Sequence, residues 1–553
     1  MSDNECIQII PLGGMGEIGK NMLAVRYQDT ILVIDTGLMF PEEELLGIDV
    51  VIPDITYLVE NRDKVKAILL THGHEDHVGA LPYVLKELQV PVYGSRLTLG
   101  IVESKLKEHN LDSECLNEVK PRDLIRIDEL EIEFIRVSHS IPDAMGIAIH
   151  TPMGIILHTG DIKLDQTPVD GQVVDFRKLA ELGEKGVLVF LGDSTNADKP
   201  GFTMSEKVVG NTFDELFGKC DGRIIVTTFA SNVHRIQQVI NTAHNYGRKV
   251  CVIGRSMVNN VKISTELGYM KIPEGILIEQ EDISKYSPNQ LVIVTTGSQG
   301  EPMSALTRMA TADHRWVGIE PDDTVIISAT PIPGNEKLVA RTVDLLFRQG
   351  AEVIYEKGMG VHVSGHAAQE ELKILLNLVR PKFFIPVHGE YRHLMQHARL
   401  AESLGIPRSR IFVAENGQII EVDHKKASIV GKVTAGKVLV DGLGVGDVGN
   451  IVLRDRKQLS QDGIMIVVVT IQKETGEVLA GPDIVTRGFV YVRESEELID
   501  DAKERVKEAL DSCGQRRITE WAVIKAQVRD RLGKHLYEKT GRRPMILPII
   551  MEV

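Results

Sequence analysis

Three histidines and one aspartate fall within six consecutive positions of this chain. Residues 72–77 read His-Gly-His-Glu-Asp-His and directly follow the mostly apolar run 65–71. Histidine accounts for only 17 of the 553 residues, so this density is hard to attribute to chance or to an ordinary solvated loop. Imidazole nitrogens and carboxylate oxygens are the ligands that zinc prefers in catalytic sites, where one position stays open for water. The motif therefore indicates a metal-dependent hydrolase.

Further donor residues follow other predicted strands. Two metal ions need about six to eight donor groups, more than the first motif supplies. His139, Asp161 and His388 each come directly after an apolar or alternating run that reads as a strand. Because each donor ends a strand, we expect these side chains along one rim of a stack of sheets, where loops on a rigid scaffold carry chemistry. Any one of these histidines alone would be read as an ordinary surface or core residue; the shared context favours ligation.

The order of these donors resembles the metallo-β-lactamase fold, and in particular its nucleic-acid-processing branch, β-CASP. Several motifs are similar to those of bacterial ribonuclease J, and the resemblance covers nearly the whole chain: residues 12–21, 71–77, 159–161, 192–195, 297–302, 363–366, 386–390 and 543–553. It implies an α/β protein in which a metallo-β-lactamase αββα sandwich is interrupted by a parallel α/β β-CASP domain. A small α+β domain is expected at the C-terminus.

The pattern of apolar runs predicts where these parts begin and end. Six apolar runs between 187 and 355 alternate with helical stretches, as in a parallel α/β sheet. Since His388 comes only after this region, the sandwich must be interrupted and then resumed. The predicted parts are a first metallo-β-lactamase part at 1–207, the β-CASP domain at 208–360, a second metallo-β-lactamase part at 361–448 and a C-terminal domain with linker at 449–553.

The resemblance also implies the metal ligands and the reaction. One zinc would be held by three histidines and the other by an aspartate and two histidines, with a second aspartate between the ions; in that order the residues are His72, His74, His139, Asp76, His77, His388 and Asp161. We therefore expect two zinc ions per subunit, with manganese as the alternative. The expected reaction is two-metal hydrolysis of phosphodiester bonds.

Three residues are expected to take part in catalysis. Asp76 is a ligand in the first motif, and Asp193 would orient a histidine ligand or the attacking water. His366 matches a family histidine that assists the leaving group, so it would stabilise the transition state or protonate the departing 3′ oxygen. Asp49 and Asp441 match positions that bind a structural calcium in some relatives, which implies a calcium site here as well.

The substrate-binding residues are expected in two places. Residues 361–366 precede a helix predicted to begin near Ala367, and a helix N-terminus favours anions, although a plain helix cap is the alternative from the sequence alone. The resemblance implies that this segment binds substrate phosphate and that Phe229 stacks on a base, where a core phenylalanine is the alternative. The full expected set is His362, Val363, Ser364, Gly365, His366, Phe229, Ser231 and Asn232.

A glycine-rich segment near the N-terminus suggests a rival function. Gly14, Gly16 and Gly19 have the spacing of a dinucleotide-binding loop, and Asp35 lies at a suitable distance for a ribose contact. Such a loop requires a helix after its third glycine, whereas residues 22–35 read as two strands joined by a turn. We therefore reject a nicotinamide site and expect these glycines to let an early loop pass close to the metals.

Composition restricts the cellular setting and raises one difficulty. No apolar stretch approaches the ~20 residues of a membrane span and no signal segment is visible, so we expect a cytoplasmic protein without a membrane partner. Five scattered cysteines without paired spacing argue against a thiolate zinc site.

The net charge of −15 is unusual for a protein that binds a polyanion such as RNA. Two divalent ions and a local basic groove can nevertheless dominate the electrostatic field at the predicted metal site.

Three classes of function fit parts of this pattern. The resemblance implies a ribonuclease with 5′-to-3′ exonuclease and endonuclease activity, acting on single-stranded RNA with a preference for a 5′ monophosphate, in RNA maturation (including rRNA) and mRNA decay. A small-molecule metallohydrolase would have no use for the phosphate-lined insert, and a silent RNA-binding subunit should lose ligands.

The C-terminal region predicts self-association as a homodimer or higher oligomer, with a paralogous subunit or RNA-decay proteins as further partners. Its apolar surfaces are two amphipathic helices, near 496–510 and 518–537, and a closing apolar strand at 545–553.

Overall fold

The computed structural model describes residues 6–42, 44–301, 303–332, 334–355, 357–472, 477–516, 518 and 520–553. The chain forms two compact units. The first comprises Met1–Phe40 and Val51–Val438, and the second comprises Pro41–Val50 and Leu439–Val553. None of the described helices is long and apolar enough to cross a membrane.

Two facing β-sheets form the centre of the first unit. The larger sheet has the strand order β23-β22-β1-β3-β4-β6-β7-β8. Its strands are β1 (Ile7–Gly13), β3 (Met22–Tyr27), β4 (Thr30–Ile34), β6 (Val65–Leu69), β7 (Val92–Gly94), β8 (Leu116–Glu118), β22 (Gln418–Val422) and β23 (Ala427–Lys432). Strands β3 and β4 are antiparallel neighbours, so the prediction of two strands after Gly19 is confirmed.

The second sheet has the order β20-β13-β12-β11-β10-β9. Its strands are β9 (Leu124–Ile127), β10 (Leu130–Arg136), β11 (Met145–Thr151), β12 (Gly154–His158), β13 (Val187–Asp193) and β20 (Phe383–Val387). Side chains such as Val25, Phe134 and Ile385 are fully or almost fully buried between the two sheets. Strand β20 pairs in parallel with β13, although the two lie far apart in the sequence.

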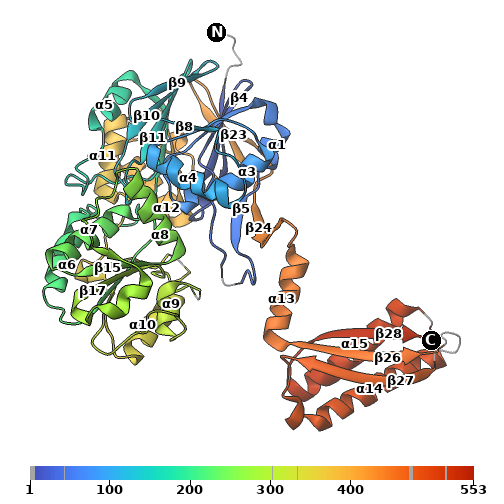
Figure 1. The fold of residues 1–553 in the computed structure, drawn as a ribbon. Helices are drawn as coiled ribbons and strands as arrows, with labels where there is room; N and C mark the ends of the chain where they lie inside the picture. The colour runs from blue at the N-terminus through green and yellow to red at the C-terminus, as the bar shows by residue number, and fades with distance from the viewer. Residues whose placement is uncertain are drawn as a thin grey trace. The chain divides into compact units, whose positions relative to one another are not determined.

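Helices cover both outer faces of this sandwich (Figure 1). On the larger sheet, apolar side chains such as Leu58, Leu81 and Val102 pack from α1 (Thr56–Glu60), α2 (Glu75–Val78), α3 (Leu81–Glu87) and α4 (Arg96–Glu108). On the other sheet, Leu179 and Leu375 are among those that pack from α5 (Phe176–Lys185), α11 (Gln369–Val379) and α12 (Tyr391–Ser403). The layers are therefore those of an αββα sandwich.

A third, fully parallel sheet lies between β13 and β20 in the sequence, in the order β16-β15-β17-β14-β18-β19. Its strands are β14 (Ile224–Thr227), β15 (Lys249–Ile253), β16 (Leu277–Ile278), β17 (Leu291–Thr295), β18 (Thr324–Ile327) and β19 (Glu352–Ile354). One face packs on α6 (Lys207–Phe217), α7 (Val233–Asn245) and α8 (Arg255–Glu266), and the other on α9 (Ala305–Ala310) and α10 (Glu336–Arg348). The predicted interruption of the sandwich by a parallel α/β domain is confirmed.

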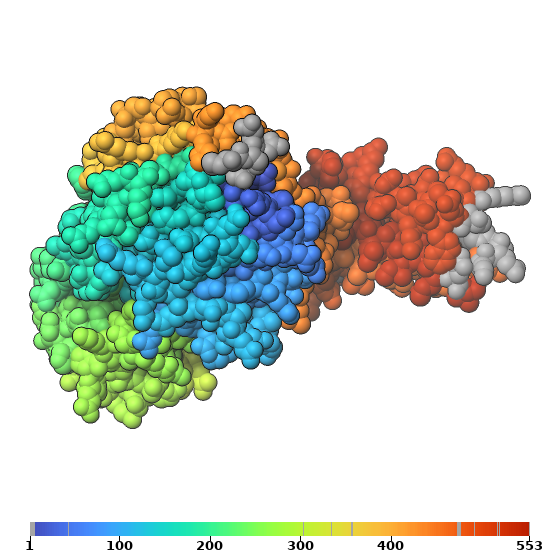
Figure 2. Space-filling view, turned by 90° about the horizontal axis from the view of Figure 1, so that it is seen from above, coloured from blue at the N-terminus to red at the C-terminus, as the bar shows by residue number. Residues whose placement is uncertain are grey.

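This insert packs directly on the sandwich. A Cβ atom on Gly100 of α4 would lie 2.7 Å from Leu267 Cδ1, at the C-terminal end of α8. Asn259 of α8 also donates to Ser104 Oγ at 2.8 Å. Figure 2 shows the insert, in green, beside the cyan and blue half of the sandwich.

The second unit is an α+β domain. Its sheet has the order β27-β26-β28, from β26 (Ile464–Ile471), β27 (Val478–Arg487) and β28 (Met545–Glu552). Helices α14 (Glu496–Gln515) and α15 (Trp521–Thr540) bury residues such as Val506 and Leu532 on one face of this sheet. Helix α13 (Asn450–Asp462), which the sequence did not lead us to expect, precedes it with no buried residue.

The remaining described strands are short: β2 (Met15–Gly16), β5 (Val50–Pro53), β21 (Gly389–Glu390), β24 (Lys437–Asp441) and β25 (Gly444–Val445). The fold class predicted from the sequence is thus confirmed, whereas the domain boundaries at 207, 360 and 448 remain predictions.

Candidate metal centre

The seven predicted metal ligands come together at one rim of the sandwich. They follow β6, β10, β12 and β20, as their strand-end positions predict; Asp76 and His77 lie in the short helix α2, and the others lie in loops. Their donor atoms form two groups of four residues, in each of which all donor atoms lie within 4.8 Å of one another: His72, His74, His139 and Asp161, and Asp76, His77, Asp161 and His388.

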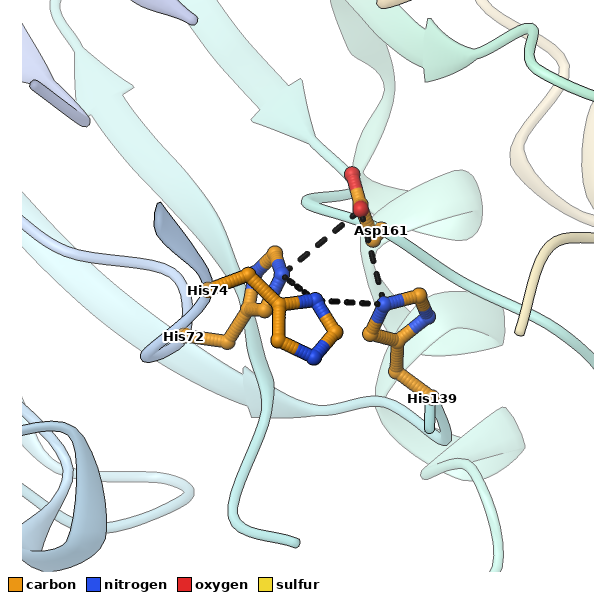
Figure 3. A group of neighbouring side chains, drawn as sticks. All are labelled: His72, His74, His139 and Asp161. Carbon is orange, nitrogen blue, oxygen red and sulfur yellow. Dashed lines mark hydrogen bonds and ion pairs between the residues drawn. The ribbon is translucent and has the colours of Figure 1, made fainter. Parts of the chain in front are cut away.

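In the first group, three imidazoles and one carboxylate point toward a common centre (Figure 3). His74 Nδ1 lies 3.0 Å from His72 Nε2 and 3.2 Å from His139 Nε2. Asp161 Oδ2 lies 3.6 Å from His72 Nε2 and 3.5 Å from His139 Nε2. Facing lone pairs of neutral imidazoles repel each other, whereas a cation between them can bind both. Nitrogens at such distances therefore suit a shared cation.

The second group uses the other oxygen of the same aspartate. Asp161 Oδ1 lies 3.3 Å from His77 Nε2 and 2.9 Å from His388 Nδ1. Asp76 Oδ2 lies 3.6 Å from His77 Nε2 and 3.4 Å from His388 Nε2. Asp161 therefore belongs to both groups, one oxygen facing each, which is the placement of a bridging ligand.

Two buried polar atoms of this site indicate that a cation fits there. Asp161 Oδ1 and His388 Nε2 are buried, and although charged groups lie within 4 Å of them, neither makes a hydrogen bond of suitable geometry among the described residues. Buried polar atoms without partners are costly, so such atoms in a native protein call for an ion or another ligand. The donor set and these two atoms together fit divalent cations held by nitrogen and oxygen.

Burial and mutual charge set the protonation states of the site. Burial lowers the pKa of His74 to about 4 and places the pKa values of His72 and His139 well below the ordinary value for histidine. Burial alone would raise the pKa of Asp161, but the imidazoles of His388 and His77 outweigh it and hold that pKa well below its usual range. Neutral imidazoles beside an ionised carboxylate are the protonation states that metal ligation requires.

The pKa values of the remaining two histidines shift the other way. Burial disfavours the charged forms of His77 and His388, but Asp161 outweighs burial at both rings and raises both pKa values well above the ordinary value. Without a metal, protons on these two rings take the place of a cation beside the carboxylates.

Outer residues fix the orientation of several ligands. Asp35 accepts hydrogen bonds from His77 Nδ1 at 2.7 Å and from the amide and hydroxyl of Thr71, each at 2.8 Å. The carbonyl of Gly365 accepts from His139 Nδ1 at 2.7 Å. Each contact leaves Nε2 of the ring to face the donor cluster. The sequence had suggested Asp35 only as a ribose contact.

The N-terminal glycine-rich loop lies against this site. Asn21 Nδ2 donates to Asp76 O at 3.0 Å and lies 3.1 Å from His77 Nε2. The segment after β4 also approaches closely: a Cβ atom at Gly37 would lie 1.6 Å from Asp76 O, so only glycine fits there. An early loop therefore passes close to the predicted ligands, as expected.

The two predicted catalytic residues outside the ligand set form a pair. His366 Nδ1 lies 2.7 Å from Asp193 Oδ2, and His366 Nε2 lies 3.9 Å from Asp161 Oδ2. Burial lowers the pKa of His366, but the carboxylates of Asp193 and Asp161 outweigh burial, so the pKa is raised. Asp193 Oδ1 also lies 3.5 Å from His388 Nδ1. His366 is thus held with its Nε2 toward the donor cluster.

The predicted phosphate-binding segment, residues 362–366, borders the same cluster. Ser364 Oγ accepts hydrogen bonds from Asn196 Nδ2 at 2.9 Å and from His366 N at 3.2 Å. With both lone pairs engaged, the Ser364 hydroxyl proton is left to donate to an anion. Helix α11 begins at Gln369, slightly later than predicted, because Glu371 caps it by accepting from Ala368 N at 2.8 Å.

The other predicted substrate residues lie at the carboxyl end of β14. Phe229 and Ser231 are half-buried, which is compatible with partial access to a ligand. Asn232 is buried, and its Oδ1 caps α7 by accepting from Arg235 N at 3.1 Å. Its side-chain oxygen is therefore already used within the fold.

The predicted calcium ligands both lie in the second unit. Asp49 Oδ2 accepts a hydrogen bond from Gly442 N at 2.8 Å. Asp441 Oδ2 is paired with Arg456, a cation that competes with calcium for this carboxylate. A calcium site at Asp49 and Asp441 remains a prediction.

The fold and the site together define a metallo-β-lactamase hydrolase with a β-CASP insert. Models of four known domains match the chain: the metallo-β-lactamase superfamily over residues 15–197, the ribonuclease J β-CASP domain over 221–346, the RNA specificity domain of zinc-dependent metallo-hydrolases over 352–413 and the ribonuclease J C-terminal domain over 451–553.

Full-length relatives agree with these matches. The chain is 48% identical over 553 residues to ribonuclease J2 of Bacillus subtilis strain 168, covering 100% of this chain and 99% of the relative. It is 44% identical over 551 residues to ribonuclease J 2 of Staphylococcus aureus strain NCTC 8325, with the same coverage. The chain belongs to the ribonuclease J family and is a metal-dependent ribonuclease.

One solved structure supports the fold alone. A protein of unknown function from Enterococcus faecalis V583 superposes with a TM-score of 0.54 at 18% identity, covering 75% of this chain and 100% of that one.

The close approach of Gly365 to a predicted ligand leads to a first prediction. A Cβ atom at residue 365 would lie 2.6 Å from His139 Cε1 and 2.8 Å from its Nδ1. We expect Gly365→Ala to displace His139 and to reduce metal affinity about 10–100-fold, as loss of an outer contact typically does. Metal content after dialysis, measured by mass spectrometry, checks this. Gly358→Ala is the matched control, since no described atom lies within 4 Å of its added Cβ; equal metal content in both variants would contradict the expectation.

Proposed function

We propose that this ribonuclease hydrolyses single-stranded RNA by two-metal catalysis, as a 5′-to-3′ exonuclease and as an endonuclease, in RNA maturation, including that of rRNA, and in mRNA decay. The observation that carries the proposal is the pair of four-residue donor groups that share Asp161. Two zinc ions per subunit suit the nitrogen and oxygen donors, with manganese as the alternative. A silent RNA-binding subunit would have no need of a complete donor set.

In the proposed reaction, the metal ions and the protein side chains have different roles. Two divalent ions, when bound, lower the pKa of water and neutralise charge on a phosphate group. The chain orients the donors: Asp35 holds His77, and the Gly365 carbonyl holds His139. With those rings fixed, little reorganisation is needed when the phosphate enters.

His366 is suited to the leaving group. Asp193 holds Nδ1, and the carboxylates of Asp193 and Asp161 raise the pKa of His366, which favours the protonated ring; its Nε2–H would then face the donor cluster. That proton can stabilise the transition state or pass to the departing 3′ oxygen, after which the Asp193 carboxylate keeps the ring in place for reprotonation.

Cleavage assays test the proposal directly. We expect His74→Ala and Asp76→Ala to remove detectable cleavage of 5′-labelled single-stranded RNA while leaving the fold intact, because each removes one donor from a different group. Chelator should have the same effect on the wild-type protein, and the exposed His424→Ala is a control that should retain activity. Wild-type turnover in either site variant, with unchanged metal content, would rule out the assigned site.

A preference for 5′-monophosphorylated RNA follows from the segment 362–366. We expect such RNA to be degraded from its end faster than triphosphorylated RNA, because the donors at this segment suit a single terminal phosphate. Ser364→Ala should reduce the preference about tenfold, the typical effect of one hydrogen bond to a charged group. Degradation rates on matched substrates measure this; identical rates for both ends in the wild-type protein would reject the pocket.

Self-association is proposed through the second unit, on the sheet face that includes the closing apolar strand expected from the sequence, β28. Helices α14 and α15 bury their apolar stripes on the sheet. The opposite sheet face is apolar and open: Leu547, Ile549, Met551 and Val485 have exposed fractions of 47, 39, 47 and 45%. Residues Ile466 and Val468 of β26 lie beside Leu547 and Ile549 on the same face. Such a face is expected to be covered in a homodimer or higher oligomer, or by a paralogous subunit or another RNA-decay protein.

Charge placed on this face should shift the oligomeric state. We expect the double variant Leu547→Lys, Ile549→Lys, and also a truncation before α13 near residue 450, to move the protein toward monomer in light scattering and to weaken activity without removing a metal ligand. Tyr537→Lys, on the exposed side of α15, is the control that should keep the wild-type state. If both altered proteins keep the full-length oligomeric state, the interface lies in the first unit.

A further inference from the structure

The loop that carries His139 lies between the donor cluster and the insert. Residues 137–144 join β10 to β11. On the side of the donor cluster, Ser140 Oγ lies 3.4 Å from His74 Nε2. The loop therefore supplies one predicted metal ligand and contacts a second one, so its conformation affects the first donor group directly.

The tip of this loop packs into the apolar core of the insert. Ile141 has an exposed fraction of 1% and belongs to the cluster that includes Val226 of β14 and Met257 of α8. Tyr269, which follows α8, packs against the same cluster. A Cβ atom at Gly73, inside the first ligand motif, would lie 3.5 Å from Ile141 Cδ1. The same side chain thus borders both the insert and the ligands.

One polar contact joins the insert to the far end of the loop. The Tyr269 hydroxyl donates to Asp143 Oδ2, and Leu97 N of α4 donates to the same oxygen at 3.5 Å. Burial, followed by the contact with Asp143, raises the pKa of Tyr269, so the hydroxyl keeps the proton that it donates. Asp143 has a φ of 68°, in the left-handed region where a residue other than glycine needs surrounding contacts to hold it.

We propose that Tyr269 is a positioning residue of the metal centre: by holding Asp143 it fixes the loop 137–144, so that the insert sets the affinity of the first donor group for its cation. The inference rests on the proposed metal-dependent function. A loop that is already ordered keeps His139 in place, whereas a loose loop must lose conformational freedom when the ion binds. The Gly365 carbonyl orients the ring of His139, and Tyr269 holds the backbone of its loop.

The chain offers two matched controls. Tyr246 is a second tyrosine of the insert, and its hydroxyl donates to Asp214 O at 2.9 Å, within the insert. Tyr246→Phe therefore removes the same group as Tyr269→Phe at a site away from the loop. Ser104 Oγ accepts from Asn259 Nδ2 at 2.8 Å, which is another hydrogen bond between the sandwich and the insert. Ser104→Ala separates a general loosening of the insert from loss of the loop contact.

Competition for zinc with a chromophoric chelator measures the affinity of each donor group. We expect Tyr269→Phe to weaken one of two zinc-binding steps about tenfold, as loss of an outer contact typically does, and to leave the other step unchanged. The weakened step should be the one that His139→Ala removes. Tyr246→Phe and Ser104→Ala should bind zinc like the wild-type protein. Asp143→Gly removes the same contact from the other side, at a φ that glycine adopts freely, and should reproduce the loss.

Hydrogen exchange provides a readout that needs neither zinc nor RNA cleavage. The Val137 amide donates to Ala144 O at 3.1 Å and closes the loop. In metal-free protein we expect this amide to exchange about tenfold faster in Tyr269→Phe than in the wild-type protein or in either control, because opening of the loop exposes it.

Two results would overturn the proposal. One is equal exchange of the Val137 amide in Tyr269→Phe and Tyr246→Phe, whether or not zinc binds. The other is equal zinc affinity in these two variants when the wild-type protein binds zinc. A wild-type protein that binds no zinc but shows the difference in exchange would count against the proposed function alone.

Discussion

A carboxylate buried among imidazoles is stable only if positive charge accompanies it, and the site is arranged around that constraint at Asp161. Its two oxygens lie within 4 Å of nitrogens from five histidines. Removing an ionised carboxylate from water costs several kcal/mol, which the surrounding charges must offset. Protons on His77 and His388 can supply part of that charge, and divalent cations can supply it while leaving the rings neutral. The same constraint explains why so many donors converge on one residue.

The sandwich satisfies this constraint by bringing strand ends from two sheets to one rim. The 72–77 motif follows β6 of the larger sheet, whereas Asp161 and His388 follow β12 and β20 of the other. The insert separates β13 from β20 in the sequence, yet the two strands pair in parallel, so His388 returns beside Asp193. The buried Arg235 on α7 donates to both oxygens of Glu206, just before the insert, and to Val363 O, just after it, and so joins the two ends of the insert.

The sequence was sufficient to predict the fold class, the seven clustered donors and the parallel insert, because each has a local signature: a dense motif, a donor after an apolar run, or alternation of strand and helix. It did not reveal Asp35 as a partner of His77, nor Arg235 as a partner of His362, because those contacts join residues 42 and 127 positions apart. Helix α13 was missed because it buries no residue and so has no apolar period. The sequence named the closing strand and both helices as apolar surfaces, but it could not show that the helices bury their stripes on the sheet whereas the other sheet face stays open, since an apolar stripe does not say which surface covers it.

The central proposal for this site is that Asp161 bridges two metal ions. Crystals of the wild-type protein, measured with X-rays at the zinc absorption edge, test it most directly. We predict two anomalous peaks per subunit, one beside His72, His74 and His139 and the other beside Asp76, His77 and His388, with one Asp161 oxygen on each. Asp161, Asp193, His366 and His388 form a third group of donor atoms that lie within 4.8 Å of one another. A single peak, or a second peak at that group without Asp76, would contradict the proposed placement.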